Sequence, residues 1–211
     1  MITLRAKAVE FKVTYIDLAN KPEWFLAISP HGKVPVVVVD EQPLFESNAI
    51  AEYIEEAVTP HLHPQDLIKR ARNRAWTDYI VDFAKALSGI YLIRNAEDMV
   101  SSIENARGPL GKLEKALTEE RDNLGPYFNG TSMCLVDAAY APFFMRFARI
   151  DAKLRTGLLD EFPLVKAWSD ALLDSEVVRG SVAPNFGEKF VQHLYKRESF
   201  VAPLLDSERA A

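Results

Sequence analysis

The sequence predicts a small α/β unit followed by an all-helical unit, and three observations support this fold class. Strand-like patterns are confined to the first sixty residues. A proline-rich break, TPHLHP at residues 59–64, follows them. After this break, apolar residues recur every three to four positions, as they do on one face of a helix. We therefore expect an α/β domain over residues 1–59 and an all-α domain over residues 60–211.

The composition excludes several classes of function. The chain has 211 residues, of which 26% are charged, and its net charge is −5. This acidic balance argues against a nucleic-acid partner, which would require a clustered basic face. The lone Cys134 excludes an internal disulfide framework and a cysteine-based zinc site. No apolar run approaches the ~20 residues of a membrane span, and the N-terminus lacks signal-peptide features, so we expect a cytoplasmic protein without a membrane partner.

The α/β unit should contain short strands and short helices. Alternating apolar residues over Glu10–Leu18 predict a strand. The β-branched run Val34–Val39 predicts a second, buried strand, and Leu44–Phe45 a brief third one. Between the first two strands, Pro22–Ile28 has room for a short helix only. From Ser47 onward the apolar period becomes helical.

The second unit should consist of helices throughout. Apolar positions from Trp76 to Ile90 mark one long helix, and those from Ile103 to Leu117 mark its partner. Pro109 lies within this partner and should kink or delay it. Three further helices are expected over Leu135–Ile150, from Pro163 onward and over Gly187–Lys196.

The segment between Gly32 and Ser47 carries the most informative chemistry. If the peptide bond before Pro35 is cis, the backbone N–H and C=O of Val34 become free to pair with an extended ligand. Ser47 is an N-cap candidate, and the amides of a helical first turn, with the helix dipole, attract anions. Either feature alone also has an ordinary structural explanation. Side by side, they suit a small anionic peptide.

Three stretches of the sequence resemble the cytosolic glutathione transferase family, in the order in which the family carries them. They are NKPEWFLAISPHGKVPV at residues 20–36, LFESNAIAEYI at residues 44–54 and LVDAAYAPFF at residues 135–144. The resemblance covers nearly the whole chain and points to bacterial, broadly omega-like sequences. It implies a thioredoxin-like N-terminal domain, a helical C-terminal domain and a homodimer.

The resemblance also implies glutathione as co-substrate, with no metal cofactor. The glutathione thiol would be conjugated to a small hydrophobic electrophile or exchanged with a disulfide, as in detoxification. Lys33 would approach the glycyl carboxylate, and the backbone of Val34, beside a cis Pro35, would pair with the cysteinyl part. Glu46 and Ser47 would hold the γ-glutamyl end.

The pocket for the electrophile is less well defined by the resemblance. The helix that begins near Gln65 would line it, with Trp76, Tyr79 and Phe83 as the candidate residues. Aromatic residues at helical spacing more often pack in a core than contact a substrate. Core packing is therefore the preferred interpretation of all three.

The sequence departs from the family at its start. The family has a first strand, a loop with a catalytic Tyr, Ser or Cys, and then a helix. Residues 2–18 resemble the end of that helix and the second strand, so the N-terminal domain is expected to be incomplete. The expected catalytic residue would lie upstream of Met1, and none is assigned. Either the natural protein is longer, which the intact glutathione motif favours, or this is a non-catalytic binding or interaction protein of the same fold.

Cys134 is a second departure. The family has Ser or Thr at this position, followed three residues later by Asp, as a box that caps the next helix. Asp137 is retained here, but a thiol is a weak acceptor, so we expect a buried structural cysteine and a weakened cap. His61 and His63 lie close in sequence, but they have no cysteine or clear acidic partner nearby. A metal site is therefore not expected.

Overall fold

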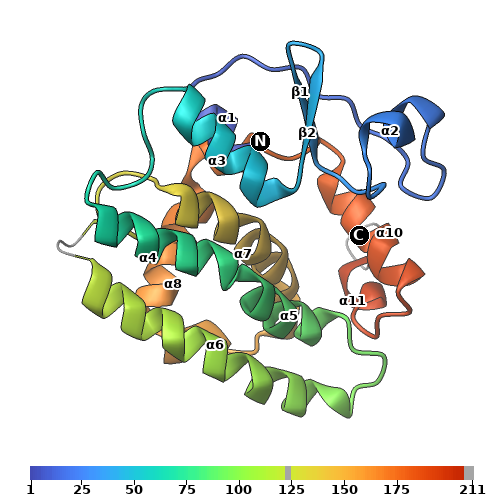
Figure 1. Cartoon of the computed structure of the whole chain (residues 1–211). Helices are drawn as coiled ribbons and strands as arrows, with labels where there is room; N and C mark the ends of the chain where they lie inside the picture. The colour runs from blue at the N-terminus through green and yellow to red at the C-terminus, as the bar shows by residue number, and fades with distance from the viewer. Residues whose placement is uncertain (122–124, 207–211) are drawn as a thin grey trace. The chain divides into compact units, whose positions relative to one another are not determined.

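The computed structural model describes residues 1–121 and 125–206 (Figure 1) and separates into two compact units, Met1–Pro64 and Gln65–Ala211. Within the described residues, the paired strands lie in the first unit, and the second unit is built from helices. An α/β part therefore precedes a helical part, as the hydrophobic periodicity predicts.

A two-stranded antiparallel hairpin is the sheet of the first unit. Strand β1 (Val36–Val39) pairs with β2 (Gln42–Phe45), with Val36 opposite Phe45. The two turn residues, Asp40–Glu41, have φ values of 47° and 66°. A two-residue turn with positive φ at both positions matches the twist of an antiparallel pair. The acidic turn therefore has the backbone geometry that a two-residue hairpin requires.

Three helices accompany the hairpin, and α3 makes most of the contacts. They are α1 (Ile2–Ala6), α2 (Glu23–Ile28) and α3 (Ser47–Ala57). Helix α3 packs against α1 and both strands. The buried apolar residues of this unit are few: Ile2, Phe25, Ile50 and Ile54.

The strand predicted over Glu10–Leu18 is wrong. Residues 9–17 have no regular secondary structure, and β1 and β2 pair only with one another within the described residues. The alternating pattern is present, but a strand requires ladder hydrogen bonds from a neighbour. Without them the apolar side chains of Val13, Tyr15 and Leu18 remain 38%, 62% and 56% exposed.

A buried ion pair fixes the end of α3. Lys7 Nζ lies 2.7 Å from Glu55 Oε2 and donates to the carbonyls of Val58 (2.6 Å) and Pro60 (2.8 Å). The Glu55 carboxylate also accepts the backbone N–H groups of residues 62–63. Burial by itself would raise the pKa of Glu55, but the ammonium and the two N–H donors outweigh it and leave this pKa lowered.

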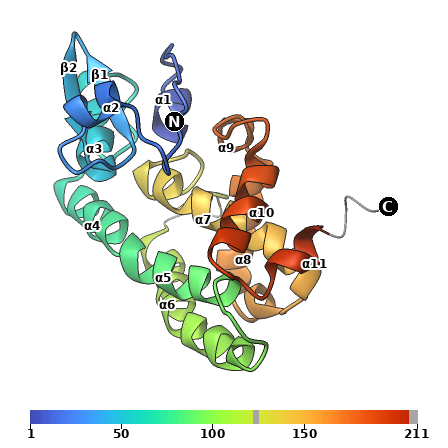
Figure 2. The same ribbon diagram turned by 90° about the vertical axis from the view of Figure 1, so that its right-hand side faces the viewer.

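The second unit is a bundle in which α7 contacts α4, α5 and α8 (Figure 2). The strongly apolar sequence of α7 is thereby enclosed by other helices. The elements are α4 (Leu67–Asp78), α5 (Ile80–Tyr91), α6 (Asp98–Glu120), α7 (Leu135–Leu154), the 3₁₀ turn η1 (Leu158–Glu161), α8 (Pro163–Asp174), α9 (Glu176–Arg179), α10 (Phe186–Lys196) and α11 (Ala202–Asp206). The three helices predicted after residue 134 correspond to α7, α8 and α10.

The single long helix predicted through Trp76 and Ile90 is interrupted at Tyr79, between α4 and α5. The Tyr140 hydroxyl donates a 2.9 Å hydrogen bond to the Trp76 carbonyl. In an unbroken helix this carbonyl is the acceptor for the N–H of Ile80. A side chain 64 residues away in the sequence thus contributes to the break.

Helix α6 runs through Pro109 without interruption and begins at Asp98, so the predicted delay is wrong. A proline in a helix removes one N–H donor, here the one that would reach the carbonyl of Asn105. The next residues on the core face, Leu110 and Leu113, are completely buried. Their packing favours continuation of the helix in spite of the lost hydrogen bond.

Aromatic rings dominate the core of the second unit. Phe83 lies 4.8 Å from the ring of Tyr140, and Tyr140 lies 5.3 Å from that of Trp168, measured between ring centroids. Such tilted pairs add to the free energy gained from burial alone. The largest fully buried aromatic side chains are Phe83, Phe128, Tyr140, Phe144, Phe147 and Trp168.

A buried carboxylate, Asp137, lies in the first turn of α7 within this core. Its Oδ1 accepts the backbone N–H of Phe128 (2.9 Å) and the indole N–H of Trp168 (2.5 Å), and its Oδ2 accepts the N–H of Cys134 (2.7 Å). The Cys134 thiol accepts from the Asp137 N–H, so both halves of the capping box are present. The box is therefore complete although its first residue is a cysteine, and Cys134 is buried as expected.

Candidate functional site

The hairpin register brings two predicted site segments to one end of the first unit. Val36 and Phe45 are the last paired residues at that end. Val34–Pro35 directly precedes this pair, and Glu46–Ser47 directly follows it, so the two dipeptides lie beside one another. Both are exposed, and the Val34–Pro35 peptide bond is cis. A backbone pairing edge and a helix start thus share one surface.

The start of α3 differs from its prediction in one respect. Ser47 is the first residue of the helix, and Glu46 (φ 66°, ψ 120°) is the N-cap, whose side chain makes no capping hydrogen bond. The first intrahelical bond joins Ile50 N–H to the Glu46 carbonyl at 2.9 Å. The backbone N–H groups before Ile50, in the first turn, have no carbonyl four residues earlier within the helix to bond to. With the positive end of the helix dipole, they can bind a carboxylate.

A tight loop carries Lys33 to the same end of the hairpin. Ser29 is buried, and its Oγ both donates to the Lys33 carbonyl (2.9 Å) and accepts the Lys33 N–H (3.0 Å). Gly32 closes the turn with a φ of 57°, a conformation that glycine adopts without strain. The Lys33 side chain is exposed and supplies a cation near the two dipeptides.

His31 is a residue of this surface that the sequence pattern did not indicate. Its Nδ1 lies 2.9 Å from Glu46 Oε1, and its ring makes an edge contact with Phe45 at a centroid distance of 5.5 Å. The contact spans 15 residues of sequence and follows from the hairpin register. No local spacing rule relates a loop histidine to a glutamate on the next strand end, so no sequence signal identifies the pair.

The three candidates for an electrophile pocket lie in the second unit and have different environments. Phe83 is completely buried and contacts the ring of Tyr140, so it is a core residue. Trp76 and Tyr79 are half-buried and form a perpendicular pair at 5.5 Å. Lys112 Nζ lies over the Tyr79 ring, 5.2 Å from its centroid. Trp76 and Tyr79 are therefore the two that retain accessible surface.

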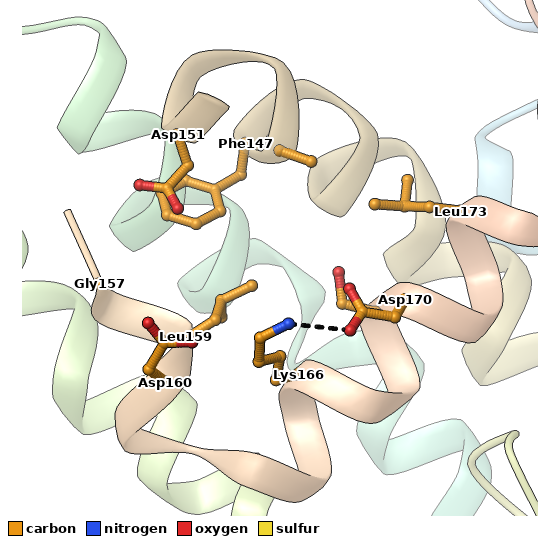
Figure 3. Close-up of a pocket in the computed structure, with 10 residues that line it drawn as sticks. Phe147, Asp151, Gly157, Leu159, Asp160, Lys166, Asp170 and Leu173 are labelled. Carbon is orange, nitrogen blue, oxygen red and sulfur yellow. Dashed lines mark hydrogen bonds and ion pairs between the residues drawn. The ribbon is translucent and has the colours of Figure 1, made fainter. Parts of the chain in front are cut away.

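A cavity of about 150 Å³ in the second unit lies between α7, η1 and α8 (Figure 3). Its polar lining includes Asp160, Lys166 and Asp170, and the last two form an ion pair at 2.9 Å. Asp151, on α7, accepts the backbone N–H of Thr156 at 2.9 Å. The sequence patterns gave no indication of this cavity, and none of the predicted site residues lines it.

The histidines near the end of the first unit have separate partners. His63 Nε2 lies 2.8 Å from Glu52 Oε1, whereas His61 Nδ1 lies 2.9 Å from the Glu55 carbonyl. Over residues 1–121 and 125–206, no three or more His, Cys, Asp or Glu side chains are grouped in a way that could hold a metal. None of the helices described is both long and apolar enough to cross a membrane.

Comparison with known proteins places the whole chain in one family. A sequence profile described as "Glutathione S-transferase, N-terminal domain" matches residues 1–56. A probable glutathione S-transferase of Glycine max is 31% identical over 188 residues, which are 87% of this chain and 81% of that protein. Glutathione S-transferase omega-1 of Sus scrofa is 29% identical over 180 residues, covering 84% of this chain and 72% of that protein.

Solved structures give the same result for the fold. The structure of rice GST1 in complex with glutathione matches with a TM-score of 0.77 and 25% identity, covering 93% of this chain and 89% of that one. The predicted architecture, a thioredoxin-like N-terminal domain followed by a helical domain, is thereby confirmed. Since the sequence identity extends across four-fifths of the soybean protein and the fold match covers nearly all of this chain, the chain belongs to the glutathione S-transferase family.

Proposed function

We propose that this chain binds glutathione at the end of the β1–β2 hairpin and transfers its thiol. The observation that carries the proposal is the hairpin register, which sets the exposed Val34–Pro35 edge beside the first turn of α3. A tripeptide with charged groups at both ends is complementary to a backbone edge flanked by a cation and a helix N-terminus. Membership of the family supports this ligand.

Each charged group of glutathione has a partner of suitable chemistry in this proposal. The Lys33 ammonium attracts the glycyl carboxylate, and the Val34 backbone pairs with the cysteinyl residue. The Ser47 hydroxyl and the first-turn amides of α3 bind the γ-glutamyl carboxylate. The Glu46 carboxylate binds the α-ammonium of the same γ-glutamyl residue. Two anionic groups and one cationic group of the ligand thus meet groups of opposite sign or dipole.

The reaction that we propose is nucleophilic transfer by the glutathione thiolate. A free thiol has a pKa of about 8.5, so only a minor fraction is ionised at neutral pH. The sulfur of the thiolate forms a bond to an electrophilic carbon while the leaving group departs with its electron pair. In the alternative exchange, the sulfur attacks a disulfide and releases a thiolate. Trp76 and Tyr79 are proposed for the electrophile pocket because they keep accessible aromatic surface.

Titration calorimetry with glutathione tests the binding site. We expect measurable binding to the unchanged chain and a dissociation constant about tenfold higher for Ser47→Ala, because a hydrogen bond to a charged group is lost. Ser101→Ala is the matched control, since Ser101 is an exposed serine in the first turns of α6 and its hydroxyl donates to the Asp98 carbonyl. Loss of affinity in both variants, or no binding at all, would refute the site.

Activity assays separate the two catalytic outcomes from the non-catalytic alternative. Conjugation of glutathione to an aryl halide and reduction of a glutathione mixed disulfide are measured on the same preparation. Turnover in either assay, lost in Ser47→Ala at subsaturating glutathione, supports the transferase. Glutathione binding without turnover in both assays would instead favour a binding or interaction protein.

We also propose that the chain acts as a homodimer in the cytoplasm. Large apolar side chains are exposed on the first unit, among them Tyr15, Leu18 and Trp24, at 62%, 56% and 51%. A contiguous apolar surface is typical of an interface, so burial of these side chains by a second copy of the chain would support the dimer. Sedimentation equilibrium should give twice the chain mass, and a concentration-independent monomer would contradict the dimer.

A further inference from the structure

We propose that His31 is a positioning residue of the glutathione site, which holds the Glu46 carboxylate ready for the α-ammonium of the γ-glutamyl residue. The inference rests on the proposed function and extends it by one residue. His31 would not touch the reacting sulfur. It would act through Glu46, by fixing one carboxylate oxygen so that the other is directed to the ligand.

The geometry of the pair allows His31 to orient the Glu46 carboxylate. Nδ1 of His31 lies 2.9 Å from Oε1 of Glu46. Because an ionised carboxylate can only accept hydrogen bonds, Nδ1 is the protonated nitrogen of this contact. The bond occupies Oε1 and leaves the lone pairs of Oε2 for another donor. The edge contact with the Phe45 ring, at 5.5 Å, restrains the imidazole from a second side.

Hydrogen bonds fix the backbone of the loop that carries His31. The buried Ser29 hydroxyl bonds to both the N–H and the C=O of Lys33, and Gly32 N–H donates to the Ser29 carbonyl at 2.9 Å. His31 lies between these anchored residues. The same turn therefore sets the position of Lys33, at one proposed end of glutathione, and of the histidine that contacts Glu46, at the other end.

The His31–Glu46 hydrogen bond matters more for ligand binding than for folding because both side chains are exposed. The side chains of His31 and Glu46 are 54% and 57% exposed, and pairs at this exposure add little to the stability of the fold. A free glutamate side chain, however, must lose rotamer freedom when a ligand orders it, and that loss weakens binding. A glutamate that is already held by His31 avoids most of this loss.

Three variants separate the hydrogen bond from the ring contact. His31→Phe keeps an aromatic ring beside Phe45 but removes the donor, and we expect glutathione to bind about two- to fivefold more weakly. His31→Asn restores an N–H donor at the place of Nδ1 and should recover most of the affinity. The matched control is His61→Phe, because the His61 side chain is 56% exposed and its Nδ1 lies at the same distance, 2.9 Å, from a carbonyl.

The decisive measurement is the binding of a glutathione analogue that lacks the α-ammonium. If His31 acts through Glu46 on that ammonium, His31→Phe and the unchanged chain should bind the analogue equally. The double variant of His31→Phe with Glu46→Gln should likewise bind glutathione no more weakly than Glu46→Gln alone. A purely structural role of His31 would weaken both ligands alike and would leave the two substitutions additive.

The possible failures are distinguishable. If the unchanged chain does not bind glutathione, the proposed function fails and this inference fails with it. If the unchanged chain binds but His31→Phe binds glutathione with the same dissociation constant, only the role of His31 is overturned. An equal loss for glutathione and for the analogue would also overturn it.

Discussion

Glu55 in the first unit and Asp137 in the second are both buried carboxylates near a helix end, but their partners differ in kind. Glu55 meets a cation, Lys7, at 2.7 Å. Asp137 meets N–H donors and the Cys134 thiol, with no cation among its hydrogen-bond partners in the described residues. Burial raises the pKa of both, and the hydrogen bonds lower both, yet the pKa ends lowered for Glu55 and raised for Asp137. Burial is the largest influence on both groups and prevails at the completely buried Asp137, whereas at Glu55 the hydrogen bond and charge of Lys7, with two backbone N–H donors, outweigh it.

The two units differ in how many apolar side chains they bury, and this difference explains why their buried carboxylates have different partners. The second unit has a set of interlocking aromatic rings, and Asp137 joins a loop residue, Phe128, to a core ring, Trp168. The first unit has few buried apolar side chains, and Lys7 ties α1 to the end of α3 and the chain that follows. A small core gains relatively more from one polar cross-connection. The comparison predicts that each carboxylate stabilises mainly its own unit.

The largest effect should come from Asp137→Ala. The substitution leaves three buried donors without an acceptor, on Phe128, Cys134 and Trp168, and should lower the free energy of unfolding by about 4 kcal/mol. Urea denaturation followed by far-UV circular dichroism measures it. Asp174→Ala is the control, since that side chain is 89% exposed, and should change stability by less than about 0.5 kcal/mol. Similar losses of stability in the two variants would contradict the role of Asp137 as the buried acceptor.

Lys7→Met should destabilise the first unit by about 3 kcal/mol, because it leaves the Glu55 carboxylate buried without a cation. Hydrogen exchange should accelerate over α3 and leave α7 nearly unchanged. The double variant Lys7→Met with Glu55→Gln removes both charges, keeps an acceptor oxygen for the N–H groups of residues 62–63, and should recover most of the loss. Faster exchange over α7 by the same amount would show that the two units do not unfold separately.

The pH dependence should have opposite signs for the two carboxylates. The folded-state pKa of Glu55 is lowered, so its contribution is present above about pH 4.5 and is lost as the pH falls through the folded value. The folded-state pKa of Asp137 is raised, so its contribution increases as the pH falls through the folded value.

Urea denaturation at a series of pH values between 7 and 3 tests these two signs. The stability advantage of the unchanged chain over Glu55→Gln should shrink on acidification. Its advantage over Asp137→Asn should grow. Two advantages that change in the same direction would contradict the opposite pKa directions of the two carboxylates.

The smallest effect concerns the residue that completes the capping box. Cys134→Ser should raise the free energy of unfolding by about 0.5–1 kcal/mol, because a hydroxyl is a better acceptor for the Asp137 N–H than a thiol is. Thermal unfolding under reducing conditions measures the difference. Cys134 is only 2% exposed. Equal or lower stability would mean that the free energy gained by burying its sulfur exceeds the gain from a stronger hydrogen bond.

The sequence predicts this molecule well where a pattern is local and less well where a distant residue intervenes. The helical periods after residue 134 and the valine run of β1 depend on near neighbours, and the structure has elements there. The alternating residues 10–18 look like a strand, but a strand depends on a partner that the pattern does not contain. The break at Tyr79 involves Tyr140, which no pattern around Trp76 includes.

The candidate site divides in the same way. The motif residues Lys33, Val34, Glu46 and Ser47 follow from the family resemblance, and β1–β2 pairing sets the two dipeptides together. His31 becomes visible only when the register is known. Ser47 looked like a cap from its position before a helix, but a positive φ at Glu46 shifts the helix start by one residue.

The Ser29 hydroxyl, bonded to both the N–H and the C=O of Lys33, also limits how this loop can vary between related sequences. Both bonds are satisfied by one spacing of the two residues, so an inserted or deleted residue between them would break the pair and displace the lysine. Related chains should therefore keep the length of this loop even where its residues change. Insertions should instead collect in loops without such a two-sided anchor.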